Sequence, residues 1–204
     1  MSDAAPPART IVAGKIGTTL LCFYLLAIAL RVGACYHADA RPHDELPDAG
    51  PRVGEAFPGF TLPDMSGPHI TLQDLAGRPA VLAFVPSLDW SAPSKARVLD
   101  LAAAVAGRHD VTLAIVLTAG AATPRSLTFA REHRVPAYVL VDGDGLTERL
   151  GLAVAGPEAA SVALPATFVL DAGGGVTLRD VRRDPRTWLD PDAILAAARL
   201  SPHP

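Results

Sequence analysis

Cysteine is almost absent from this chain of 204 residues: Cys22 and Cys35 are the only two. A disulfide framework, a zinc-finger cluster and a Cys-x-x-Cys motif are therefore excluded from everything after residue 35. Basic residues are not in excess either, since 18 Lys and Arg face 21 Asp and Glu, for a net charge of −3. Nucleic-acid-binding domains are usually basic, so the composition predicts no nucleic-acid partner.

Charged residues of both signs are scarce. They make up 19% of the chain, against 50% hydrophobic residues. This balance excludes a disordered chain and supplies enough apolar surface for a sizeable core. The length fits one domain of about 100–200 residues with an appendage.

The appendage is an apolar segment near the N-terminus. The uncharged run Ile16–Leu30 would span only about 22 Å as a helix, but its extension Ile11–Ala34 is long enough for a hydrocarbon core of about 30 Å. Arg9 and Lys15 precede it, which favours a cytoplasmic N-terminus and an exported domain. We therefore assign residues 1–35 to a membrane anchor or signal segment, a hydrophobic helix that holds the domain in the periplasm or at the cell exterior.

Two other export signals stay open. Val32 and Ala34 occupy the small-residue positions that precede a signal-peptide cleavage site. Val-Gly-Ala-Cys, which ends at Cys35, resembles the lipidation signal of bacterial lipoproteins, although Arg31 stands where that pattern has a small or apolar residue. All three interpretations place the domain outside the cytoplasm.

Residues 36–52 are polar and contain three prolines, which predicts a linker. Several of them could ligate a metal ion in principle: His37, Asp39, His43, Asp44 and Glu45. Nothing in the sequence fixes their spacing, so we expect a solvated linker and no metal site.

Residues 53–204 alternate predicted strands and helices. Continuous apolar runs at Ala80–Val85 and Val111–Leu117 are typical of strands buried on both faces. A helix is predicted from about Pro93, with Val98, Leu101 and Val105 as its buried stripe. The other expected elements are strands at Phe60–Leu62, Tyr138–Val141, Ala166–Leu170 and Val176–Val181, and helical segments at Thr71–Ala76, Pro124–His133, Leu146–Leu150 and Ile194–Leu200. This order predicts an α/β fold with a mixed central sheet and helices on both faces.

Four segments resemble one superfamily. Val53–Leu62 resembles the opening of redoxin domains, and Leu72–Leu82 resembles their helical turn and first central strand. The run Pro86-Ser-Leu-Asp resembles the active-site approach of bacterial thiol peroxidases, and Leu164–Asp171 resembles the cis-proline strand of membrane-anchored thiol-disulfide oxidoreductases. The resemblance covers about residues 53–200 and implies a thioredoxin-like fold of the redoxin and peroxiredoxin type.

Redoxin chemistry requires a thiolate at the start of the helix after the first central strand, where free N–H groups and the helix dipole stabilise it. Here Trp90-Ser91-Ala92-Pro93-Ser94 resembles the Trp-Cys-x-Pro-Cys motif with both cysteines replaced by serine. In the thiol-peroxidase alignment, Pro93 takes the peroxidatic position, Trp90 replaces a threonine, and Pro165 replaces the catalytic arginine. The region near Phe129, where a resolving cysteine is expected, contains no sulfur.

Serine cannot cycle between thiol and disulfide, so the family's redox reaction is unavailable at this site. A hydrolytic role for Ser91 or Ser94 would need a neighbouring base, and the histidines of the domain lie far from the helix start in sequence: His69, His109 and His133. We therefore expect Ser91 and Ser94 to be degenerate active-site positions in a helix cap and an exposed turn. The sequence predicts no catalytic residue and no cofactor.

These observations favour a non-catalytic binding or assembly module, tethered to the membrane through Ile11–Ala34. Its predicted groove consists of Trp90, Pro93, Leu164 and Pro165. The resemblance implies a cis Leu164–Pro165 bond, beside which an extended polypeptide or a membrane-associated protein partner could pair by strand addition.

The alternative function is the thiol-disulfide oxidoreductase or peroxidase that the resemblance implies, with Cys22 or Cys35 as its only thiol. A cluster of basic residues near the C-terminus gives no separate site, because acidic residues alternate with it. We expect these arginines to be solvated: Arg179, Arg182, Arg183 and Arg186.

Overall fold

The structure is a computed structural model that describes residues 46, 48–156 and 161–199. The apolar segment Ile11–Ala34 lies outside the described residues, and so do Cys35 and most of the predicted linker. Among the residues that are described, no helix is long and apolar enough to cross a membrane.

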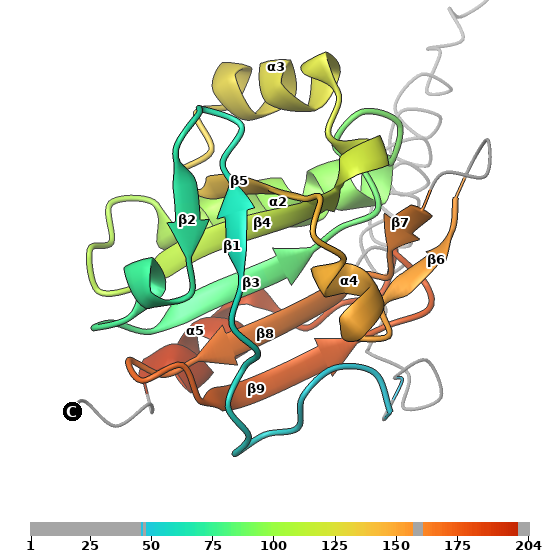
Figure 1. Ribbon diagram of the computed structural model, residues 1–204. Coiled ribbons are helices and arrows are strands. Elements are labelled where there is room, and N and C mark those ends of the chain that lie inside the picture. The colour runs from blue at the N-terminus through green and yellow to red at the C-terminus, as the bar shows by residue number, and fades with distance from the viewer. Residues whose placement is uncertain (1–45, 47, 157–160, 200–204) are drawn as a thin grey trace, which may run out of the picture. The chain divides into compact units, whose positions relative to one another are not determined.

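A five-stranded mixed sheet forms the centre of the domain, in the order β5-β4-β3-β8-β9 (Figure 1). Strands β3, β4 and β5 are parallel, whereas β8 runs antiparallel to both β3 and β9. The strands are β3 (Ala80–Phe84), β4 (Thr112–Thr118), β5 (Tyr138–Asp142), β8 (Ala166–Leu170) and β9 (Val176–Val181). Every residue of β3, β4 and β8 is buried, which explains their continuous apolar runs.

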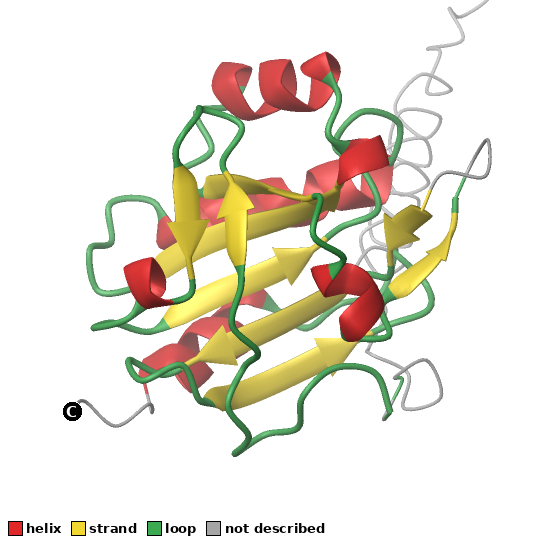
Figure 2. Cartoon of the chain, viewed as in Figure 1, coloured by secondary structure: helices red, strands yellow, loops and turns green. Residues whose placement is uncertain are grey.

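Successive residues of β3 face two separate hydrophobic cores. Leu82 and Phe84 belong to one core, which is covered by β1 (Thr61–Pro63), β2 (His69–Thr71), the 3-10 turn η2 (Gln73–Leu75) and α4 (Leu146–Arg149). Val81 and Ala83 belong to the other core, with α2 (Ala92–Val105), α3 (Pro124–Glu132) and α5 (Pro191–Arg199). In Figure 2, α2 and α5 lie behind the sheet, and β1, β2 and α4 lie in front of it. The predicted fold, a mixed sheet with helices on both faces, is confirmed.

Short elements were missed. The sequence patterns do not predict β2, the antiparallel pair β6 (Ala153–Ala155) and β7 (Ser161–Ala163), or the 3-10 turn η3 (Ala119–Ala121). Each has three residues, too few to show the periodicity of a strand or of a helix. By contrast, β3 and β4 lie within one residue of their predicted bounds, and β8 and β9 match them.

The end of the predicted linker contacts the folded domain. Leu46 N donates a hydrogen bond to Val181 O at 3.0 Å, and Gly50 N donates one to Leu150 O at 2.8 Å. Ala49 is buried in the first core. Leu46, Ala49 and Gly50 are therefore part of the packed structure rather than free in solvent.

Candidate functional site

Helix α2 begins inside the sequence that resembles the redox motif. Ser91 is its N-cap, and the Ser91 Oγ accepts a hydrogen bond from Ser94 N at 3.3 Å. Ser94 Oγ donates a second hydrogen bond to Ser91 Oγ at 2.7 Å. Pro93 lies in the first turn, where its missing N–H has no cost. The sequence prediction of a helix cap at this position is confirmed.

The two serines are shielded from solvent, so the prediction of an exposed turn was wrong for both of them. Ser91 is 4% exposed and Ser94 is 2% exposed. Among the described residues, neither hydroxyl is hydrogen-bonded to a histidine or a carboxylate, so no base is positioned to activate it. Trp90, by contrast, is 53% exposed beside the helix start.

The strand register brings distant segments to this end of the sheet. Phe84, the last residue of β3, pairs with Ala166, and Ala166 pairs with Val181 at the end of β9. Pro165 precedes Ala166 and Arg182 follows Val181, so both residues lie at the same end of the sheet as the start of α2.

The Leu164–Pro165 peptide bond is trans, because the described residues contain no cis peptide bond. The prediction of a cis bond was wrong. Both flanking backbone groups are already paired inside the domain: Leu164 N donates to Leu152 O at 2.7 Å, and Pro165 O accepts from Arg182 N at 2.9 Å. These two groups are not available to an added strand, so the strand-addition mechanism loses its structural basis here.

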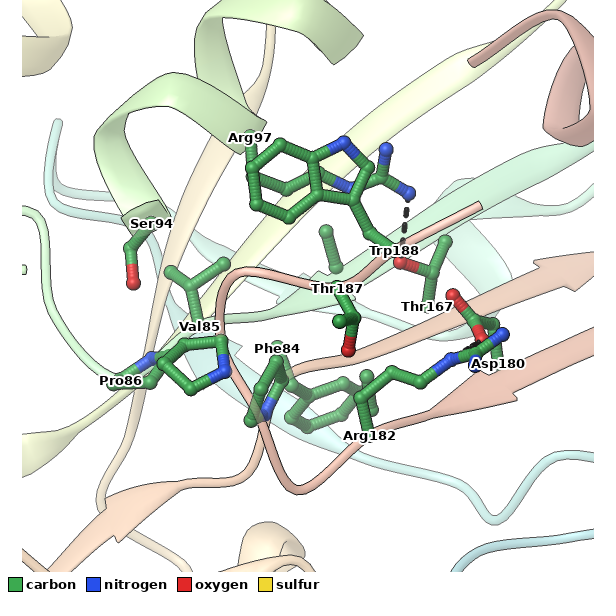
Figure 3. A pocket seen from close by; sticks show the side chains of 14 residues that line it. Phe84, Val85, Pro86, Ser94, Arg97, Thr167, Asp180, Arg182, Thr187 and Trp188 are labelled. Carbon is green, nitrogen blue, oxygen red and sulfur yellow. Dashed lines mark hydrogen bonds and ion pairs between the residues drawn. The ribbon is translucent and has the colours of Figure 1, made fainter. Parts of the chain in front are cut away.

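A small pocket with about 20 Å³ of free space lies beside Ser94 (Figure 3). Its walls include Ser94, Arg97, Pro165, Thr167, Arg182 and Trp188. Of the four predicted groove residues, only Pro165 lines it. Trp90, Pro93 and Leu164 do not, so the pocket and the predicted groove overlap at a single residue.

Arg97 crosses one side of the pocket from helix α2. It is 5% exposed, and its Nη1 donates to Leu189 O at 2.8 Å while its Nη2 donates to Thr167 Oγ1 at 3.3 Å. The guanidinium lies over the Trp188 ring, 5.7 Å from its centroid. Burial lowers the pKa of Arg97 to about 10, against the opposing effect of Asp180 and two other aspartates. Arg97 is therefore still a cation at neutral pH.

Arg182 enters the pocket from the other side, at the end of β9. It is 5% exposed, and its Nε donates to Asp180 Oδ1 in a buried ion pair. Asp180 Oδ2 also accepts from Leu189 N at 3.1 Å. The prediction that Arg182 is solvated was wrong, because Asp180 and Arg182 are two residues apart in an extended segment and turn to the same, buried side.

The other three arginines of the cluster near the C-terminus differ in their exposure to solvent. Arg179 is half-buried, and its Nε donates to Ala49 O at 3.0 Å, so the prediction of a solvated side chain was wrong there as well. Arg183 and Arg186 are exposed, as predicted. Arg97 was not identified from the sequence, although its spacing from Ser94 and Leu101 places it on the inward side of α2.

Metal ligands do not gather in the described part of the chain. No group of three or more His, Cys, Asp or Glu side chains lies close enough there to hold a metal ion. The possible ligands His37, Asp39, His43, Asp44 and Glu45 lie outside the described residues.

Similar solved structures share this fold. A thiol peroxidase from Chromobacterium violaceum superposes with a TM-score of 0.63 at 22% identity, over 76% of this chain and 90% of that one. The peroxidoxin BcpB from Mycobacterium tuberculosis gives 0.60 at 23% identity, over 72% and 96%. A peroxiredoxin-like protein from Aquifex aeolicus gives 0.63 at 15% identity, over 74% and 88%. At these identities the likeness establishes the thioredoxin-like fold.

Sequence comparison extends this result from fold to family. No curated protein matches the chain significantly. The sequence pattern of the AhpC/TSA family, however, matches residues 53–179, which is more than half of the chain. This match includes the β3–α2 junction with its two serines and the strand β8 beside it. The chain therefore belongs to the AhpC/TSA family.

Proposed function

We propose that this protein is an extracytoplasmic, membrane-tethered member of the AhpC/TSA family that works by binding a partner and not by redox turnover. The observation that carries the proposal is the hydrogen-bonded pair Ser91 and Ser94 at the start of α2, with 2.7 Å between their Oγ atoms. The family resemblance implies cysteines at these two positions. A hydroxyl there caps the helix but forms no disulfide and no sulfenic acid.

The positions of the two cysteines in the chain support the same conclusion. The only cysteines, Cys22 and Cys35, precede the matched residues 53–179. A peroxidase would need one of them to reach the position that the serines occupy. The competing function, a redoxin-type oxidoreductase, therefore depends on sulfur from outside the family domain.

Two features at the start of α2 support the binding of a partner: the exposed side chain of Trp90 and the pocket beside Ser94. Trp90 is 53% exposed at the start of α2, and large exposed aromatic residues are enriched at protein interfaces. The pocket beside Ser94 offers buried charge close by. A polypeptide or membrane-associated protein that contacts this end of the sheet is the proposed partner.

The decisive experiment measures turnover by the full chain in detergent. We expect hydrogen peroxide consumption and insulin disulfide reduction at background rates. A variant with Cys22→Ser and Cys35→Ser should behave identically. Robust turnover by the wild type that disappears in this variant would establish the oxidoreductase alternative and refute the binding proposal.

The tether has its own test. A reporter enzyme that is active only outside the cytoplasm, fused after Pro204, should be active in cells. Arg9 and Lys15 before the apolar run Ile11–Ala34 are the reason for this expected orientation. Activity of a cytoplasm-specific reporter at the same position would reverse the proposed topology.

A further inference from the structure

The pocket beside Ser94 holds more positive than negative charge. Arg97 and Arg182 are both buried, and Asp180 is the only carboxylate among the residues that line the pocket. Asp100 and Asp190, which also act on Arg97, are exposed to solvent. Two buried guanidinium groups thus share one buried carboxylate, an imbalance that is costly in a low-dielectric interior.

Arg182 has unused hydrogen-bond donors. Its guanidinium carries N–H groups on Nε, Nη1 and Nη2. Within the described part of the chain, the hydrogen bond from Nε to Asp180 Oδ1 is the one that this guanidinium forms. The N–H groups of Nη1 and Nη2 have no protein acceptor there. Arg182 is thus a nine-tenths buried cation in the pocket wall whose Nη atoms stay accessible, since Arg108 Nε is the one fully enclosed side-chain donor without a partner among the described residues.

The surroundings suit a planar anion with two oxygens. Two parallel N–H groups of an arginine match the oxygens of a carboxylate. The walls are otherwise largely apolar, from Phe84, Val85, Pro165 and the ring of Trp188 (Figure 3), and a low local dielectric strengthens a charged hydrogen bond. The free space of about 20 Å³ admits the end of a side chain and excludes a bulky cofactor.

We propose that this pocket binds a carboxylate group, held by Arg182 and balanced by the charge of Arg97. The carboxylate is an Asp or Glu side chain, or the C-terminus, of the polypeptide partner. The inference rests on the proposed binding function and supplies the chemistry that recognises the partner.

The test titrates the full chain in detergent with acetate at fixed pH, with chloride keeping the ionic strength constant. Trp188, which lines the pocket, serves as the fluorescent reporter. A pentapeptide with one central glutamate and blocked ends is titrated in parallel, and the same peptide with glutamine is its control. Saturable binding of acetate and of the glutamate peptide, without binding of the glutamine peptide, is the expected result.

Two arginine variants locate the site. Arg182→Gln should weaken carboxylate binding about tenfold to a hundredfold, the usual effect of losing a charged hydrogen bond. Arg186→Gln is the matched control, because Arg186 is exposed and paired with Asp184; it should bind like the wild type. Equal affinity in both variants, or no saturable binding of either probe, overturns the proposal. Binding of acetate alone overturns the polypeptide source.

A third variant covers the case in which Arg182→Gln does not fold. Asp180→Asn keeps the shape and the acceptor oxygen but removes the competing negative charge. Carboxylate affinity should then rise about tenfold, and unchanged or weaker binding contradicts the proposal. Peroxide turnover by the wild type would refute the proposed function while leaving these titrations intact, so the two failures are distinguishable.

Discussion

Restoring sulfur at the start of α2 is the most direct probe of what this site retains. The double change Ser91→Cys and Ser94→Cys should create a thiol pair that oxidises readily to a disulfide. The two Oγ atoms are 2.7 Å apart. A disulfide needs its sulfurs at about 2.05 Å, so the terminal atoms must approach by only about 0.7 Å.

The size of the effect follows from the cap geometry. Ser94 N already donates to the side chain at position 91, and a sulfur at the N-cap of α2 would receive the same stabilisation. Cysteines at helix N-termini have pKa values of about 3.5–7.5, against about 8.5 for a free thiol. A pKa of about 7 would give roughly 30 times more thiolate at pH 6 than a free thiol has. Burial of both positions opposes this effect, and position 91, whose side chain receives the N–H of residue 94, should react first.

Oxidation should also stabilise the domain. Closing a loop of about four residues is worth about 2 kcal/mol in the chain-entropy model. For a domain of this size that corresponds to a rise in Tm of about 4–8 °C. A difference of this size between the oxidised and reduced forms is easily measured.

The assay compares alkylation rates from pH 5 to 9 and Tm with and without reductant, all in a Cys22→Ser, Cys35→Ser background. Thr128→Cys in the same background is the control, because Thr128 is an exposed residue inside α3 and gives an ordinary thiol. If the double variant folds but its thiols stay unpaired and react no faster at pH 6 than the control, the helix-start reasoning fails. The alignment with Trp-Cys-x-Pro-Cys would fail with it.

Two further predictions test the packing and the electrostatics of the domain. Gly50→Ala should lower the free energy of unfolding by about 2 kcal/mol or more, because φ at Gly50 is +77° and a Cβ would lie 2.5 Å from Phe168 Cζ. Gly54→Ala is the control: φ is +89° there but the space around it is open, so only the backbone strain should lower the free energy of unfolding. Thr71→Val should raise the pKa of Asp74 in an NMR titration, because the hydrogen bond from the Thr71 hydroxyl is the main cause of its lowered value. A lowered carboxyl pKa stabilises the fold at pH values above the unfolded-state pKa, and this stabilisation is lost as the pH falls through the folded-state pKa. The Thr71→Val variant should therefore lose less stability than the wild type on acidification. An unchanged pKa of Asp74 in the variant would refute the assignment.

The sequence predicts those parts of the fold whose signal is local. Buried strands such as β3 and β4 are continuous apolar runs, and the start of α2 carries a cap residue followed by proline. The buried ion pair of Asp180 and Arg182 was missed because its burial has no local signal in the sequence. Its burial depends on partners far away in the chain, and alternating charges look the same on a solvated strand. Two opposite charges two residues apart on one face were the available signal.

The predictions of a cis Leu164–Pro165 bond and of free backbone groups beside it were both based on the resemblance to a cis-proline strand. A sequence motif carries the chemistry of its family only where the surrounding contacts are also kept. Here Leu164 N is paired with Leu152 O, and Pro165 O with Arg182 N, so the backbone that would receive a strand is occupied. The Leu164–Leu152 hydrogen bond continues the register of the β6–β7 pair, in which Ala153 pairs with Ala163, and these three-residue strands leave no signal in the sequence.

The serine pair at the start of α2 and the neighbouring arginine pocket differ in how well their polar groups are satisfied. At the helix start, each serine satisfies the other and the cap, so that half is explained by stability alone. In the pocket beside it, Arg97 and Arg182 are both buried, and Asp180 is the one carboxylate that lines the same pocket. Buried charges of this kind often cost stability compared with apolar side chains. A domain that needed only to fold would gain from replacing these charges. Their presence beside the start of α2 is the reason for our proposal that this end of the sheet binds a carboxylate.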